Sequence, residues 1–158
     1  TGVNKGFNRV EEYFRIIDRI HAHNIAVQVG IVFGFDYDTP RTFEETLEFL
    51  EAAGVQNATF NILTPYPGTA LFRKLFAEGR ILTQDWRKYN SREDVVYQPK
   101  QMSTAELLTG FRYANQRFYS LTSIARRLSR SPVQLWWTLP LNLAYHRRWA
   151  KQAQARSG

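Results

Sequence analysis

Two polar segments of this chain carry the side chains best suited to chemistry, and each follows an apolar run. The first contains Asp36 and Asp38, two carboxylates spaced two residues apart. The second, Thr64-Pro65-Tyr66-Pro67-Gly68-Thr69, combines a phenol and two hydroxyl groups with a backbone stiffened by prolines. These residue types are compatible with a cation site, with a loop that faces a substrate or a phosphate, and with turns that cap helices.

The interpretations of these loops differ in what the side chains bind. Asp36 and Asp38 suit bonds to local backbone amides and a cap for a helix near residue 40, and we favour this structural role. Asp36 is also the carboxylate that we place at the mouth of a site. In the second loop we favour turns and caps for most residues, and Tyr66 is the residue expected to reach a substrate.

A parallel sheet would bring both segments to one place. Residues 25–33 are β-branched and almost all apolar, which predicts a strand buried on both faces, and residues 57–63 predict a second strand. An amphipathic helix over about 40–53, with Pro40 at its first position and Gly54 after its end, connects them. Such a strand–helix–strand unit puts both loops at the carboxyl edge of the sheet, where ligands bind in α/β folds.

Helical periodicity continues on both sides of this unit. In the last of these helices, Ser103 and Glu106 have the spacing of a capping box. Trp86 and Tyr89 lie in a stretch without period that we interpret as an ordered, aromatic-anchored loop. The predicted helices span residues 7–23, about 70–77 and about 104–128, and Pro132 and Pro140 are expected to divide the tail.

The composition bounds the chemistry. The length of 158 residues and a hydrophobic share of 44% suit one globular domain, and no apolar run is long enough for a membrane-spanning helix. There is no cysteine, which excludes disulfides, thiolate zinc sites and a cysteine-held iron–sulfur cluster within these residues. The three histidines are too scattered to indicate a metal site. The chain has neither an initiator methionine nor a signal-peptide pattern, so we expect a cytoplasmic piece of a longer protein.

The charge is concentrated in the C-terminal third. Residues 1–103 hold 12 basic and 13 acidic residues, whereas residues 104–158 hold 9 basic residues and a single acid, Glu106. Three interpretations of this tail stay open: a helical cap that packs its aromatic residues, a surface for an anionic membrane and, least favoured, a nucleic-acid surface. The residues concerned are Arg112, Arg117, Arg126, Arg127, Arg130, Arg147, Arg148 and Lys151, with Trp136, Trp137, Tyr145 and Trp149.

An ordered set of short motifs carries a family resemblance. The motifs are Asn4-Lys5-Gly6-Phe7-Asn8, Phe33-Gly34-Phe35-Asp36-Tyr37-Asp38-Thr39, the stretch from Asn61 to Thr69, Glu78-Gly79-Arg80-Ile81 and Asp85-Trp86-Arg87-Lys88-Tyr89. Over roughly residues 1–128 the chain resembles the radical S-adenosylmethionine enzymes, and more narrowly their cobalamin-binding-domain-associated branch.

The resemblance implies a fold and a division of the chain. It implies an α/β architecture in which the chain forms the C-terminal portion of a partial (βα)6 TIM-like barrel, with the upstream barrel half of the same protein as its partner. Residues 1–79 would complete the barrel, residues 80–103 would form the aromatic-anchored loop, and residues 104–158 would form a basic helical extension. An unpaired parallel strand also predicts self-association of the isolated fragment.

The resemblance also implies cofactors. In this family a three-cysteine loop holds a 4Fe-4S cluster that reduces S-adenosylmethionine to a radical or, with cobalamin, supports methyl transfer. That loop is absent here, so we assign this fragment no catalytic residue and no metal ligand, and we expect it to bind none of these cofactors completely. The parent protein is expected to catalyse radical-based methyl transfer or a related modification. The alternative is a non-catalytic module that binds a membrane surface or nucleic acid through the basic aromatic tail.

The resemblance finally implies contacts to the adenosine. Gly30-Ile31-Val32-Phe33-Gly34 loosely matches a glycine-rich strand of the family, and a missing Cβ lets a ring approach the backbone. The alternative is that these glycines only accommodate a neighbouring helix. The residues predicted to bind cofactor are Gly30, Val32, Gly34, Asn61 and Leu63, and those predicted to bind substrate are Asp36 and Tyr66.

Overall fold

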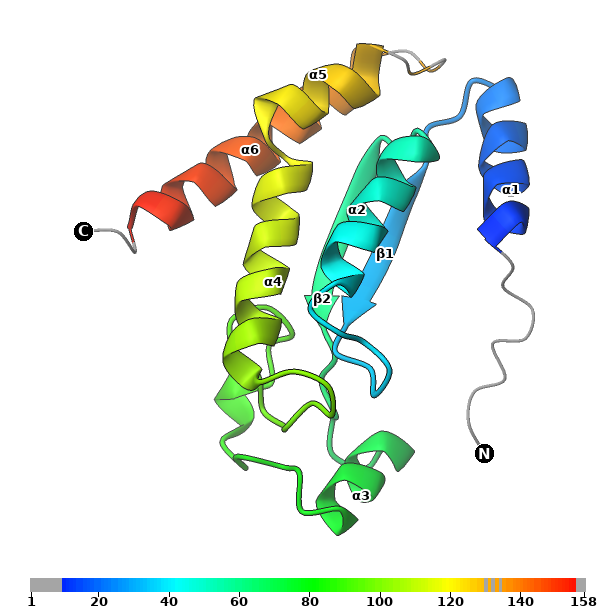
Figure 1. The fold of residues 1–158 in the computed structure, drawn as a ribbon. Coiled ribbons are helices and arrows are strands. Elements are labelled where there is room, and N and C mark those ends of the chain that lie inside the picture. Colours follow the sequence, from blue (N-terminus) through cyan, green and yellow to red (C-terminus); the bar gives the residue numbers. More distant parts are fainter. Residues whose placement is uncertain (1–9, 130, 132, 134, 156–158) are drawn as a thin grey trace. The chain divides into compact units, whose positions relative to one another are not determined.

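The computed structural model describes residues 10–129, 131, 133 and 135–155, so the predictions for Asn4–Asn8 and Pro132 lie outside the described residues. Figure 1 shows its helices and strands. In chain order they are α1 (Val10–Ala22), β1 (Gln28–Phe33), α2 (Thr42–Ala52), β2 (Asn57–Ile62), α3 (Ala70–Ala77), the 3-10 turn η1 (Trp86–Lys88), α4 (Thr104–Phe118), α5 (Leu121–Ser129) and α6 (Thr138–Gln154).

The predicted strand–helix–strand unit is confirmed, and β1 and β2 form a two-stranded sheet. The amide of Asn57 donates to the carbonyl of Val27 at 3.2 Å, and the amide of Leu63 donates to Phe33 at 2.8 Å. From the first hydrogen bond to the second, the donor and the acceptor both move six residues toward the C-terminus. The strands are therefore parallel, as the two arrows of Figure 1 show. The strands are shorter than predicted, because residues 25–27 precede β1 and Leu63 follows β2.

Within the described residues the first strand is covered on one face only, and not on both faces as predicted. Along β1, Phe33 is buried, whereas Gly30 and Val32 are exposed. Phe33 and Phe60 stack at 5.8 Å between ring centroids and form the packed face of the sheet. Asn61 of β2 is only half-buried. This alternation of exposed and covered side chains indicates a sheet with one open face. The described residues cover the face that carries Phe33 and Phe60 and leave the opposite face open.

Local signals fixed the ends of several helices as predicted. Gly54 ends α2 with φ +63°, the left-handed conformation that glycine adopts without strain. The hydroxyl of Thr69 accepts from the amide of Phe72 and caps α3, which has the predicted bounds. At the start of α4 the Ser103 amide donates to the Glu106 carboxylate at 2.7 Å, and the Glu106 amide donates back to the Ser103 hydroxyl at 3.1 Å.

Three predicted boundaries are wrong. The helix expected over about 104–128 is broken into α4 and α5, because the hydroxyl of Ser120 accepts from the Ser123 amide and starts a new helix. Pro40 does not occupy the first helical position, since α2 begins two residues later at Thr42. Pro140 does not divide the tail: it lies in the first turn of α6, where no helical partner needs its missing N–H group.

The segment over residues 80–100 is a loop organised by one antiparallel bridge between Ile81 and Tyr97. Tyr89 is buried as predicted and donates to the carbonyl of Thr83 at 2.7 Å. Trp86 packs its ring against Tyr89 with 4.9 Å between centroids but stays 52% exposed. The loop is therefore anchored by Tyr89 and Tyr97 more than by its tryptophan.

The chain divides into two compact units that interleave in sequence. The first contains the described parts of residues 1–29, 48–58 and 119–158, and the second contains residues 30–47 and 59–118. In the first unit α5 and α6 contact each other, and Tyr119 stacks on Tyr145 with 4.7 Å between ring centroids. In the part of the chain that the structure describes, no helix combines the length and hydropathy needed to cross a bilayer.

Candidate functional site

The candidate site lies in the second unit, at the carboxyl ends of β1 and β2. Gly34 follows β1 with φ +107°, and a Cβ there would clash with the hydroxyl of Tyr97. The same hydroxyl donates a hydrogen bond to the Gly34 carbonyl. Glycine is therefore required at this position by the backbone conformation and by Tyr97, a structural reason that is independent of any ligand.

Tyr97 fixes the end of β1 from the loop over residues 80–100. Its burial, assisted by the negative charge of Asp38, raises the pKa of the phenol above its ordinary value, so the group stays protonated and serves as a donor. Asp38 is itself buried and accepts from the amides of Gly34 at 2.7 Å and Phe35 at 2.9 Å. The predicted bonds of Asp38 to backbone amides are confirmed, and they fold the loop after β1 into one turn.

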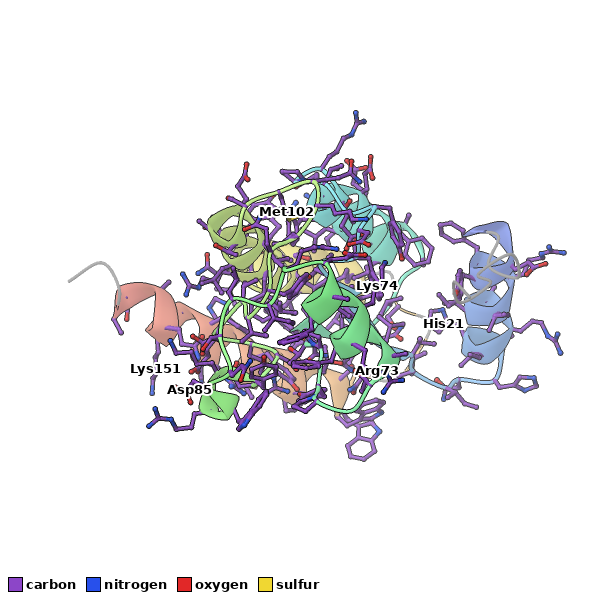
Figure 2. The ribbon with its side chains drawn as sticks, turned by 90° about the horizontal axis from the view of Figure 1, so that it is seen from below. His21, Arg73, Lys74, Asp85, Met102 and Lys151 are labelled. Carbon is purple, nitrogen blue, oxygen red and sulfur yellow. The ribbon has the colours of Figure 1, made fainter. Side chains whose placement is uncertain are left out.

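Asp36 lies at the centre of a cluster of basic side chains. Its carboxylate is 2.8 Å from the guanidinium of Arg80, 3.0 Å from the ammonium of Lys74 and 3.5 Å from that of Lys100. In Figure 2 the label of Lys74 marks the ion-pair partner that α3 contributes. Glu78 is also bound to Arg80 at 2.8 Å, so three cations face two carboxylates. The cluster therefore leaves one positive charge in excess beside the loop.

The charges in the cluster change the pKa of Asp36. Partial burial alone would raise the pKa of this carboxyl, but the hydrogen bonds from Arg80 and Lys74, with their charges, outweigh burial and lower it to about 2. Asp36 is therefore ionised under all ordinary conditions. Its carboxylate binds basic groups of the same chain, so its first role is to position Arg80, Lys74 and Lys100.

Tyr66 is 48% exposed, and its hydroxyl lies 3.0 Å from that of Ser91. Its carbonyl accepts from the Thr69 hydroxyl at 2.7 Å, and Gly68 has φ +82°. The turn-and-cap interpretation of this loop is confirmed by these contacts. The phenol of Tyr66 stays accessible, so its predicted contact with a substrate remains a prediction.

The residues predicted to bind the adenosine lie on or beside the open face of the sheet. Gly30 and Val32 are exposed on β1, and among the described residues a Cβ on Gly30 would meet the Thr59 hydroxyl at 3.8 Å and no other atom within 4 Å. On β2 the half-buried amide of Asn61 makes no side-chain hydrogen bond within the described part of the chain. Leu63 is half-buried, just beyond the strand.

The groups on this face are partly apolar and partly polar. Gly30 has no side chain to cover the backbone, and the amide of Asn61 offers two donors and an acceptor. The backbone amides at the end of β2 offer few hydrogen bonds to a ligand, because the amides of Ile62 and Leu63 already donate to the carbonyl oxygens of Ser91 and Phe33. Contact at this end of β2 is thus left to side chains and carbonyl oxygens.

Sequence reasoning missed the basic half of the cluster. Lys74, Arg80 and Lys100 are distant from Asp36 in sequence, and no spacing rule links a loop aspartate to them. The only signal was that Arg80 stands in the motif Glu78-Gly79-Arg80-Ile81, which was noted for the resemblance and not for its charge.

The histidines and acids do not gather into a metal site in the described part of the chain. In the first unit His21 is buried and lies 3.1 Å from the side-chain oxygen of Gln56, which also accepts from the amide of Val27 at 2.7 Å. His21 also lies in the last turn of α1, where a basic side chain suits the carbonyl end of a helix.

Comparison with known proteins gives a consistent group of relatives. The chain is 31% identical over 135 residues to the bacteriochlorophyllide d C-12(1)-methyltransferase of Chlorobaculum tepidum. The aligned region covers 85% of this chain and 29% of that protein. It is 33% identical over 88 residues to the hopanoid C-2 methylase of Rhodopseudomonas palustris, covering 56% of this chain and 17% of the methylase. It is 29% identical over 110 residues to the anaerobic magnesium-protoporphyrin IX monomethyl ester cyclase of Cereibacter sphaeroides. This alignment covers 70% of this chain and 18% of the cyclase.

No family model matches the chain. The chain spans less than a third of the length of each of these relatives. The likeness therefore concerns one portion of larger enzymes.

Proposed function

We propose that this chain is the C-terminal part of a radical S-adenosylmethionine enzyme of the cobalamin-associated branch. The sequence motifs and the methyltransferase and cyclase relatives support this proposal. The chain contributes the adenosine contact and part of the substrate pocket of such an enzyme. The whole protein catalyses radical-based methyl transfer or a related modification. The relatives support the reaction class, and the structural observation that supports the adenosine contact is the open face of the sheet around Gly30, Val32 and Asn61.

In this proposal the two strands complete a partial (βα)6 barrel. Strands of a parallel barrel are covered on both faces, yet β1 alternates between exposed and covered residues. The open face is then the face toward the barrel interior, and the upstream half of the same protein covers it. Residues 1–79 complete the barrel, residues 80–103 form the loop beside it, and residues 104–158 form the helical extension.

The fit to the cofactors is partial. The chain has no cysteine, so the ligands of a 4Fe-4S cluster lie outside these residues. In this proposal Gly30, Val32, Asn61 and Leu63 would hold the adenosine of S-adenosylmethionine, with Val32 and Leu63 as apolar contacts and the amide of Asn61 as the polar contact. When bound, S-adenosylmethionine supplies radical or methyl-transfer chemistry together with the cluster, and cobalamin is a further cofactor that the branch suggests.

The loops at this edge then shape the substrate pocket. Asp36 orients the cations of Lys74, Arg80 and Lys100, and the phenol of Tyr66 is accessible beside them. The relatives are named for acting on bacteriochlorophyllide d, a hopanoid and magnesium-protoporphyrin IX monomethyl ester. These are large molecules with extensive apolar surface, so we propose a substrate of the same kind here.

The first experiment measures the reaction on the full-length protein that carries this chain. The protein is purified without oxygen, reconstituted with iron and sulfide, and mixed with dithionite and S-adenosylmethionine. Release of 5′-deoxyadenosine is expected for the radical class, and S-adenosylhomocysteine beside it for methyl transfer. Failure to form a cluster, together with the absence of both products, would contradict the proposal.

A second experiment tests the open face itself. Gly30→Leu should weaken S-adenosylmethionine binding in equilibrium dialysis by at least about tenfold, because a leucine side chain fills the space left for the ring. Gly30→Ala adds only a methyl group at 3.8 Å from Thr59 and should have a smaller effect. Ala125→Leu, at an exposed position of α5, introduces the same side chain away from the sheet and should leave binding unchanged. Equal binding by Gly30→Leu and the original protein would remove Gly30 from the site.

A further inference from the structure

An apolar patch interrupts the surface of the first unit at the start of α6. Trp136 is 76% exposed, and Leu135, Trp137 and Leu139 are each about two-fifths exposed. These four neighbouring residues, hereafter the aromatic patch, face water instead of the interior. The cap interpretation of the tail expects its aromatic residues to pack inward; Tyr145 does so, whereas Trp136 is not covered by the described residues. Exposed large apolar side chains that are neighbours in this way are typical of an interaction surface.

Helix α6 is nevertheless well anchored on its other side. Asn142 is fully buried and donates to Gln56, Asn57 and Thr138 at 2.8–3.2 Å, while Tyr145 stacks on Tyr119. The exposure of the aromatic patch is therefore not the result of a loosely attached helix.

One exposed side of α6 carries positive charge, and Trp137, seven residues before Ala144, lies in its register. Exposed Ala144, Arg147, Arg148 and Lys151 follow the three- and four-residue spacing of one helix face. Glu106 is the last acidic residue of the sequence, so the stretch from residue 107 onward holds no carboxylate side chain. The three cations, hereafter the basic stripe, have no ion-pair partner within the residues that the structure describes. The face thus combines exposed tryptophans with uncompensated positive charge.

We propose that this face docks the protein on an anionic lipid bilayer. Tryptophan rings reside at headgroup depth, and cations near the surface are attracted to anionic lipids. The aliphatic side chains of Leu135 and Leu139 favour lipid over nucleic acid, because they gain free energy in a hydrocarbon boundary but cannot stack on bases. The contact is interfacial, since no described helix is able to span the membrane. This docking goes beyond the proposed function, because it would bring the enzyme to apolar substrates dissolved in the bilayer.

The test is co-sedimentation of the full-length protein with vesicles. Vesicles of phosphatidylcholine with phosphatidylglycerol should bind the protein strongly at low salt and more weakly at high salt, because ions screen the attraction. Arg147→Gln, Arg148→Gln and Lys151→Gln together should lower this binding about a hundredfold. The matched control removes the same charge from three exposed cations of the other unit, through Arg41→Gln, Arg87→Gln and Lys88→Gln, and should change binding far less.

The aromatic patch has its own test. Trp136→Ser with Trp137→Ser should lower vesicle binding about tenfold, and Trp86→Ser, at an exposed tryptophan of the other unit, should not. Tryptophan fluorescence of the original protein should be quenched by brominated lipid, and most of that quenching should be lost in the double variant. Equal losses in test and control variants, or binding to single-stranded RNA in preference to vesicles, would overturn the proposal. None of these measurements depends on S-adenosylmethionine chemistry, so their failure is distinguishable from failure of the proposed function.

Discussion

At the scale of single residues, Asp36 shows how a loop carboxylate is assigned a role. The sequence offered it as a ligand of a cation, as a helix cap or as a substrate contact. The structure surrounds it with Arg80, Lys74 and Lys100, and the first two of these hold its pKa at about 2. Its nearest physical task is to hold three segments together: the loop after β1, the helix α3 and the loop over residues 80–100.

Removing the Asp36 charge should therefore destabilise the protein. Asp36→Asn leaves three cations close together and should cost about 1 kcal/mol of unfolding free energy, since the partly exposed cluster is screened by solvent. Urea denaturation measures the difference. Glu45→Gln is the matched control, because Glu45 pairs with Arg41 in an exposed position at 3.0 Å and should matter by a few tenths of a kcal/mol.

The same substitution has a defined pH dependence. The pKa of Asp36 is lower in the folded protein than the ordinary value of 3.8, so its contribution to stability is complete above about pH 4. The contribution is lost as the pH falls from about 4 toward 2, where the carboxylate becomes protonated in the folded state. The difference in unfolding free energy between Asp36→Asn and the original protein should vanish over that range. A difference that is constant with pH would contradict the charge argument.

At the scale of elements, a buried arginine joins α5 to the end of the turn before β2. Arg127 is 2% exposed and donates to the carbonyls of Val55 at 3.2 Å and Gln56 at 2.8 Å and to the side chain of Asn142 at 3.1 Å. Burial lowers its pKa to about 10, against the opposing charge of Glu51, so the guanidinium remains protonated at neutral pH. The sequence counted Arg127 in the basic surface of the tail, and that prediction is wrong for this residue.

Adjacent arginines of α5 provide a matched pair for mutation. Arg127→Met should lower the free energy of unfolding by about 3 kcal/mol, because buried carbonyl oxygens lose their donors. Arg126→Met breaks only the exposed pair with Glu51, at 2.8 Å, and should cost less than about 1 kcal/mol. Chemical denaturation of both variants distinguishes the two cases. Equal losses of unfolding free energy in the two variants would mean that the buried hydrogen bonds of Arg127 stabilise the protein no more than an exposed ion pair does.

At the scale of the whole molecule, the uneven distribution of apolar surface matters most. Val32 on β1 is 39% exposed, and the face around it has no cover within the described residues. A sheet with unpaired strand edges and an open face is a template for association with another copy. The 158-residue chain studied alone should therefore form oligomers as its concentration rises.

Sedimentation velocity tests this self-association. Val32→Lys places a charge on the open face and should shift the isolated chain toward the monomer by about tenfold in dissociation constant. Tyr37→Lys, at a 61% exposed residue outside the sheet, is the control and should have little effect. A sharp monomeric species at high concentration of the original chain would contradict the prediction.

The sequence by itself determined the local structure of this protein. The α/β class, the strand–helix–strand unit, the bounds of α3 and the caps at Gly54, Thr69 and Ser103 all follow from residues within a few positions of one another. The family resemblance was also readable, because it depends on the order of short motifs. Where the sequence failed locally, as at Ser120 and Pro40, a competing cap or turn moved the boundary by a few residues.

Only the tertiary structure decided which side chains meet. Asp36 finds Lys74, Arg80 and Lys100, Gly34 packs against Tyr97, and Arg127 is buried while Trp136 is exposed. The physical reason is that contacts between residues tens of positions apart depend on how the chain returns to the sheet. Composition records that an arginine is charged and a tryptophan apolar, but burial is decided by the neighbours that the fold supplies.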